Sequence, residues 1–330
     1  MAGLSANERW QGLAPTAFWL ALLLLPLGRT SELAIVAFAI AGLVLAWRQR
    51  RELSRIPQAR LALALFACWW LPALVSAPDA VMPAKTWSTV AGGLRYAPFL
   101  LGAVLLLGGD TRGLARLRWL AAIVVALWTA DALLQAATGW SVAGRLDGDR
   151  LSGIFGDENQ KLGPVLAVLS PVLLLESLDR YGRRATLLLW LLLGAAILLA
   201  GARAGWVAYA VVTVLVAARV AHGARQFGAL LGIAAAAGLA LSALAYVASP
   251  RFAERVERTL AVTEGSAAAT DHALAFRLPI WHAALGMAAA HPVNGVGARG
   301  FRHAYAEFAA ADDRWLDPRY GQGALHAHQW

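Results

Sequence analysis

The sequence predicts an all-α fold, a polytopic transmembrane helix bundle with a helical lid. Hydrophobic residues make up 59% of the 330 residues, whereas soluble domains are closer to 45–50% apolar. The mean hydropathy is +0.57, and the apolar residues form long continuous runs rather than the alternating pattern of a membrane barrel. The net charge of +9 resides mainly in arginines of an Ala-, Gly- and Arg-rich chain, and we predict a lipid bilayer and no nucleic acid as its partner.

Nine apolar runs are candidates for spanning helices, because about 20 apolar residues cross the hydrocarbon core of a bilayer. The first run has a weak basic flank and no convincing cleavage site, so we expect a membrane helix rather than a cleaved signal peptide. Prolines within or near helix ends are tolerated where a bundle satisfies the freed backbone groups. The expected helices are 13–28, 32–47, 60–77, 92–108, 116–138, 162–178, 185–201, 204–220 and 227–248.

The placement of arginines predicts a cytoplasmic N-terminus. Connections that would then face inward are all net basic, and the short outward connections carry mixed or little charge, as the positive-inside rule requires. The loop 139–161, the connection around Arg203 and the chain from residue 249 onward fall on the outer side. The predicted inner connections are 48–60, 110–118, 179–185 and 218–227.

The last eighty residues differ from the rest and predict a second region. Residues 250–260 place Phe252, Val256 and Leu260 at four-residue spacing between charges, a pattern suited to a helix at the membrane interface. A short linker, two short helices and a final loop are expected to follow, with no spanning segment. We therefore divide the chain into a bundle of about nine helices, 1–248, and an outer region with short helices, 249–330.

Arg203 is the one charged residue in a nearly apolar stretch from 186 to 218. A charge inside a bilayer costs at least a few kcal/mol, so such a residue is a candidate functional site. The alternative is that residues 201–205 form a tight turn between two helices and that the arginine lies at the water interface.

Three short motifs suggest cofactors or metals, but none is complete. GVGARG (295–300) fits the dinucleotide fingerprint, which requires a preceding strand and a βαβ unit; here we expect a glycine-rich turn. Asp147 and Asp149 form a D-x-D motif in a short outer loop. His326 and His328 could be two zinc ligands, but a third is evident only if Asp312 or Asp313 supplies it. We predict no metal and no cofactor.

Several cations fall on the predicted outer side together with the two histidines. Guanidinium groups bind phosphate in bidentate fashion, and histidine is the usual general base near neutral pH. This combination at the mouth of a membrane bundle suits a lipid diphosphate, whereas the alternative for any one of them is a solvated or interface-anchoring side chain. The candidates are Arg203, Arg277, Arg299, Arg302, His326, His328 and the two lysines of the chain, Lys85 and Lys161.

An ordered set of motifs resembles the O-antigen ligase family and the related O-antigen polymerases and O-linked oligosaccharyltransferases. It comprises RLSGIFGDENQKLG (150–163), with Gly153, Phe155 and Asn159 matching, then GARAGWVAY (201–209) and RLPIW (277–281). HPVNGVG (291–297), with Phe301 and Tyr305 after it, and LHAHQW (325–330) complete the set. The resemblance covers about residues 150–330 by motif and the remainder by helix pattern.

The resemblance implies a metal-independent glycosyltransferase of the bacterial inner membrane with its active site on the periplasmic face. It would transfer O-antigen glycan from undecaprenyl diphosphate to a hydroxyl of the lipid A core in lipopolysaccharide biosynthesis. By the same resemblance His328 is the essential histidine, acting as general base, and Arg203 and Arg277 are the essential arginines, binding the diphosphate. Supporting roles then fall to His326, Lys85, Lys161, Asn159, Arg299 and Arg302.

The sequence departs from the family pattern at two positions and at its end. Gln329 stands where the family usually has Asn, and Glu158 where a proline is common. The family continues beyond the histidine with further membrane helices, so we expect these helices to be absent from the 330 residues. The motifs do not separate a ligase from an O-antigen polymerase or a protein O-oligosaccharyltransferase. A lipid-linked glycan flippase or other transporter is the alternative from a different class.

Overall fold

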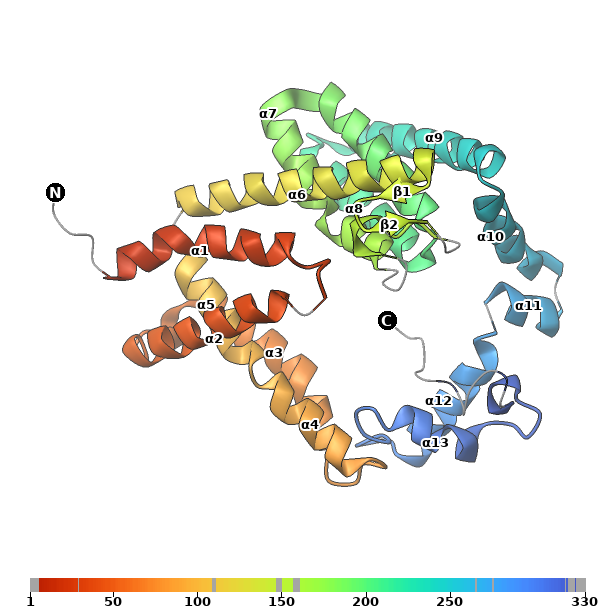
Figure 1. Ribbon diagram of the computed structural model, residues 1–330, viewed down its shortest axis with the longest axis horizontal. Coiled ribbons are helices and arrows are strands. Elements are labelled where there is room, and N and C mark those ends of the chain that lie inside the picture. Colours follow the sequence, from red (N-terminus) through yellow and green to blue (C-terminus); the bar gives the residue numbers. More distant parts are fainter. Residues whose placement is uncertain are drawn as a thin grey trace. The chain divides into compact units, whose positions relative to one another are not determined.

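The computed structural model describes residues 6–28, 30–108, 111–146, 150–156, 161–264, 266–274, 276–317, 319 and 324. Almost all regular structure in these residues is helical, which confirms the all-α prediction. In chain order the elements are α1 (Ala6–Leu23), α2 (Ser31–Arg48), η1 (Leu53–Arg55), α3 (Pro57–Val75), α4 (Pro83–Gly93), α5 (Tyr96–Leu107), α6 (Thr111–Thr138), β1 (Trp140–Ser141), β2 (Gly144–Arg145), η2 (Gly153–Phe155), α7 (Leu162–Leu199), α8 (Arg203–Val220), α9 (Ala224–Ala248), α10 (Pro250–Leu260), η3 (Ala261–Glu264), α11 (Ala267–Ala273), α12 (Leu278–Ala290), α13 (Phe301–Phe308) and η4 (Arg314–Leu316) (Figure 1).

Seven helices among the described residues are long and apolar enough to cross a membrane. The longest, α7, contains two of the nine expected spans, and the expected span 13–28 corresponds to a shorter apolar segment, Ala14–Leu23, of α1. The segment from Pro83 to Leu107 combines α4 and α5 and includes the expected span 92–108. The transmembrane helix bundle predicted from composition is therefore confirmed.

Helix α7 is a hairpin of two arms joined at Gly182. That glycine has φ 77° and ψ −175°, a conformation no helix contains. A Cβ added at Gly163, at the start of the first arm, would lie 3.2 Å from the Cβ of Ala200, just beyond the end of the second. The arms are therefore antiparallel, as expected for two spans joined by the basic connection 179–185, and both ends of α7 lie on one side (Figure 1).

The chain forms two compact units. Unit 1 comprises residues 1–34 and 110–257, and unit 2 comprises 35–109 and 258–330. The core of unit 1 lies where α7 packs against α6 and α8, and it centres on the fully buried side chains of Trp128, Leu162, Leu166, Leu193 and Ile197.

In unit 1 the loop after α6 is fixed to that helix by buried side chains. Gln135 Oε1 accepts the backbone N–H groups of Ser152 (3.0 Å) and Gly153 (2.9 Å). Asp131 Oδ1 accepts the N–H of Val142 at 2.8 Å. These bonds satisfy backbone donors that would otherwise be buried without partners, and they hold the loop that leads into α7.

Unit 2 brings the second to fifth helices together with the tail. Helices α2 and α5 cross at Gly42 and Gly102, where an added Cβ on either glycine would collide with the backbone of the opposite helix. Small residues at such a crossing let membrane helices approach closely. In the tail, α12 and α13 enclose a small core around Ile280, Met287 and Tyr305.

Candidate functional site

Arg203 lies at a tight turn between the hairpin of α7 and helix α8. Gly201 has φ +70°, which favours glycine, Ala202 is extended, and Arg203 is the first residue of α8. Its side chain is partly buried. The turn expected at 201–205 is therefore present, and the arginine stands at a helix N-terminus. That end of a helix already carries positive partial charge, so an added cation there creates a place for an anion.

Lys161 reaches the same end of unit 1 from another element. It is the residue before α7, and its side chain is exposed. Two residues later, Gly163 packs against the turn: a Cβ on Gly205 would lie 3.0 Å from the carbonyl carbon of Gly163. The structure thus places the N-termini of α7 and α8 side by side, with Lys161 before one and Arg203 at the start of the other.

Arg255 is a third cation at this turn, and sequence reasoning missed it. Helix α10 docks on the turn through Phe252, whose ring lies 5.5 Å from that of Trp206. Arg255 is 9% exposed, and its guanidinium occupies the space where Gly201 would carry a side chain. The four-residue pattern assigned Phe252 and Leu260 to one membrane-facing surface. In the structure Phe252 is 3% exposed and Leu260 58%, because the helix packs on protein through its first turns.

Arg277 directly precedes α12 in unit 2, and its backbone is fixed by contacts of the two adjacent residues, Phe276 and Leu278. Asp271 Oδ1 accepts the N–H of Leu278 at 3.0 Å, which caps the helix. Phe276 has φ 59°, a strained value for a residue with a side chain. Its carbonyl accepts the indole N–H of Trp315 at 2.9 Å, and the Arg314 guanidinium lies 3.8 Å from its ring centre. These contacts fix the chain where Arg277 emerges, partly buried.

The segment GVGARG forms the expected glycine-rich turn and packs against residues 80–86 of unit 2. Gly297 has φ +86°, and a side chain there would collide with Ala80. Thr86, fully buried, donates its hydroxyl to the carbonyl of Ala298 at 2.8 Å. Both segments were predicted to face the outer side, and this contact requires that they share one side of a membrane.

The remaining candidates divide between the units or lie outside the described residues. Arg203 and Lys161 belong to unit 1, whereas Arg277, Lys85, Arg299 and Arg302 belong to unit 2. Arg299 is exposed and has φ 64°, and Arg302 is exposed on α13. Their shared role with Arg203 stays a prediction. The candidates outside the described residues are Asn159, His326, His328, Asp147 and Asp149.

Among the described residues there is no group of three or more His, Cys, Asp or Glu side chains that could hold a metal ion. Asp313, offered above as a third zinc ligand, is buried and uses both carboxylate oxygens, which accept from the Tyr305 hydroxyl (2.7 Å) and the Trp315 N–H (2.9 Å). Its position is explained by the packing of the tail.

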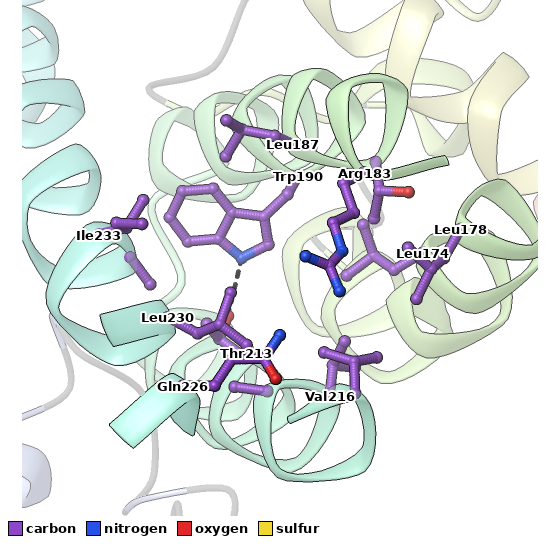
Figure 2. A pocket seen from close by; sticks show the side chains of 14 residues that line it. Leu174, Leu178, Arg183, Leu187, Trp190, Thr213, Val216, Gln226, Leu230 and Ile233 are labelled. Atoms are coloured by element: carbon purple, nitrogen blue, oxygen red, sulfur yellow. Dashed lines mark hydrogen bonds between the residues drawn. The ribbon is translucent and has the colours of Figure 1, made fainter. Parts of the chain in front are cut away.

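An apolar cavity of about 230 Å³ lies between α7, α8 and α9 (Figure 2). The Trp190 indole N–H donates to Thr213 Oγ1 at 2.9 Å in its wall, and Arg183 and Gln226 supply polar groups. A second cavity of about 420 Å³ shares Trp190 and Thr213 and extends to Trp206, three residues after Arg203. Together the two cavities follow the second arm of α7 up to the Arg203 turn, with walls suited to hydrocarbon.

The part of the chain that contains the Arg203 turn matches a known protein family. Residues 187–330 match the family model described as O-antigen ligase. This segment is similar to the O-antigen ligase family. No curated protein and no solved structure matches the chain.

The matched segment begins in the second arm of α7 and includes Arg203, Arg255, Arg277 and the whole tail. The resemblance drawn from the ordered motifs is confirmed over this range. An O-antigen ligase domain indicates an enzyme of the ligase or polymerase type, acting as a glycosyltransferase on a lipid-linked glycan, in a multi-pass membrane protein.

Proposed function

We propose that this protein is an inner-membrane O-antigen ligase that transfers glycan from undecaprenyl diphosphate to a hydroxyl of the lipid A core. The match to the O-antigen ligase domain over the segment with the Arg203 turn carries this proposal. The N-terminus would be cytoplasmic and the active site periplasmic, as the distribution of arginine predicts.

The proposed chemistry is a displacement at the anomeric carbon of the donor sugar. The acceptor oxygen forms a bond to that carbon, the bond between the carbon and the diphosphate oxygen breaks, and His328 takes the proton of the hydroxyl. Charge grows on the departing diphosphate, so donors fixed where that charge develops stabilise the transition state. Arg203 and Arg277 would supply them without a metal ion, and His326 and Asn159 would support the site.

Three features of unit 1 support a lipid-linked diphosphate donor. The Arg203 turn combines the N-termini of α7 and α8 with Lys161 and the buried Arg255. Neighbouring helix N-termini favour anions through their backbone N–H groups. The apolar cavities reach Trp206 beside this turn, which suits the hydrocarbon chain of the donor.

The rival in the same class is an O-antigen polymerase or a protein O-oligosaccharyltransferase, which would use the same donor chemistry. A flippase is the rival in another class. It would be expected to carry charges deep within several spans, whereas the described cations of the site lie at helix ends and in the tail.

Lipopolysaccharide from a deletion strain separates these functions. A ligase predicts that all O-antigen bands disappear while lipid-linked polymer accumulates, and that the wild-type gene restores them. A band with a single repeat would instead identify a polymerase. Unchanged lipopolysaccharide with unglycosylated proteins would identify a protein glycosyltransferase. Loss of lipid-linked glycan from the periplasmic leaflet would identify a flippase.

A further inference from the structure

A lysine and a histidine from distant parts of the chain are in direct contact in unit 2. Lys85 Nζ lies 3.1 Å from His303 Nε2, although 218 residues separate them in the sequence. Lys85 is in the first turn of α4 and His303 in the first turn of α13, and both side chains are exposed. In this geometry the ammonium group donates to a neutral imidazole.

The backbone beneath this pair is fixed by contacts on both segments. The N–H of Val81 donates to the carbonyl of Val296 at 3.2 Å, and the buried Thr86 hydroxyl donates to the carbonyl of Ala298. Gly297 fits against Ala80 with no room for a side chain. The Lys85–His303 pair is therefore held by packed structure on both sides.

Two further arginines lie close to this pair in the sequence. Arg302 adjoins His303, and Arg299 is held at positive φ at the end of the turn that precedes α13. Of the nearby acidic groups, Asp79 accepts from the Asn294 amide at 2.7 Å, and Glu307 lies one turn further along α13. Partial desolvation, Lys85 and Arg302 together lower the pKa of His303 below its ordinary value.

We propose that Lys85, His303 and Arg302 form a phosphate-binding site of the outer face. Ammonium, imidazolium and guanidinium groups are the natural partners of a phosphate dianion, and bonds between charged groups are the strong ones. A bound dianion favours the imidazolium form of His303, in which Nε2 becomes a donor. Phosphate binding then favours the uptake of a proton at His303.

The contacts within unit 2 support the existence of a phosphate-binding site. Only the identity of the molecule that supplies the phosphate rests on the proposed function. In that reaction the group is either the diphosphate of the donor or a phosphate on the core saccharide of the acceptor. The pH dependence has a definite sign. Since binding raises the pKa of His303, the imidazolium form binds more tightly. Above the second pKa of the phosphate itself, at about 6, affinity therefore falls as pH rises through the pKa of the bound histidine.

The test uses the full chain in lipid nanodiscs with ¹³C-labelled histidine. His303→Gln assigns the His303 resonance, and methyl phosphate and methyl diphosphate are the probes. We expect the pKa of His303 to rise by about one unit when either probe binds, which corresponds to about tenfold tighter binding to the imidazolium form than to the neutral form. Lys85→Met and Arg302→Gln should each weaken binding about tenfold, whereas Arg225→Gln, an exposed arginine on α9, should not.

Each outcome decides a separate point. A His303 pKa that does not respond to either probe, or equal affinities for Lys85→Met and Arg225→Gln, overturns the site. If the site stands, stronger binding of methyl diphosphate assigns it to the donor, and stronger binding of methyl phosphate assigns it to the acceptor. Phosphate binding with normal lipopolysaccharide in the deletion strain would overturn the proposed function and leave the site intact.

Discussion

The guanidinium of Arg255 lies over Gly201, in the space that a side chain at position 201 would need. One residue of α10 is thereby locked against the turn that begins α8, two positions before Arg203. Because the turn also requires φ +70°, only glycine satisfies both conditions. The contact ties the position of Arg203 to the docking of α10.

Gly201→Ala should therefore impair glycan transfer more than the backbone strain alone would. A non-glycine residue in the left-handed region costs about 1–2 kcal/mol, and here the methyl group also displaces Arg255. Gly28→Ala is the matched control, since Gly28 has φ +69° and nothing within 4 Å of an added Cβ. Glycan transfer and thermal unfolding are measured for both. Equal losses would show that Arg255 has no part in placing Arg203.

Arg203→Lys should not restore the transfer lost in Arg203→Ala. A planar guanidinium matches a diphosphate with two parallel bonds, which a single ammonium cannot reproduce. Both variants should insert in the membrane as the wild type does, and transfer is measured in membranes with equal protein levels. Near-full activity of the lysine variant would mean that Arg203 only anchors the helix at the interface.

His328→Ala in the full-length protein should lower the transfer rate by about 10²–10⁴-fold, the usual contribution of a general base. Donor affinity should be largely kept, because the arginines bind the diphosphate. His326→Ala should cost less. Rates and donor binding are compared for both variants. A larger loss at His326 would move the base two residues earlier, and small equal losses would return both histidines to structural roles.

Transfer should proceed in excess EDTA. The proposed arginines balance the charge of the leaving group, a task that other enzymes give to a divalent ion. The purified full-length protein is assayed with lipid-linked donor and lipid A core acceptor. Activity that EDTA abolishes and Mg²⁺ or Zn²⁺ restores would return Asp147 and Asp149, or the two histidines, to consideration as ligands.

Tyr305→Phe should destabilise the tail. The buried Tyr305 hydroxyl donates to Asp313 Oδ2 at 2.7 Å, and a lost hydrogen bond to a charged group costs about 1.5–3 kcal/mol. Burial, and then the bond to Asp313, raise the pKa of Tyr305. The contribution of this hydrogen bond to the stability of the fold is therefore present at neutral pH and is lost only in strongly alkaline solution. The midpoint of thermal unfolding should fall for Tyr305→Phe and stay unchanged for Tyr181→Phe, an exposed tyrosine.

The sequence was sufficient where a local pattern determines the structure. Continuous apolar runs predicted the membrane helices, and the charged connection 179–185 predicted the break that the structure places at Gly182. The turn at 201–205 and the glycine-rich turn at 295–300 also follow from local composition, because positive φ selects glycine.

Contacts between distant segments could not be predicted in this way. Nothing near Arg255 in the sequence points to Gly201, and the four-residue pattern of α10 says only that one face is apolar. The pairing of Lys85 with His303 depends on how the tail packs against the start of α4. Such contacts arise from the packing of whole helices against one another. No pattern of neighbouring residues in a single sequence indicates them.

The contact between Thr86 and Ala298 has a consequence for the order of synthesis. The two residues are 212 positions apart, and at about 5–20 residues per second a ribosome needs roughly 10–40 s to pass from one to the other. During that interval the start of α4 is already made, but the turn that covers it does not yet exist. Unit 2 therefore closes late, after the membrane helices between its two halves have been inserted. Fragments divided between α9 and α11 and expressed together should still be able to assemble.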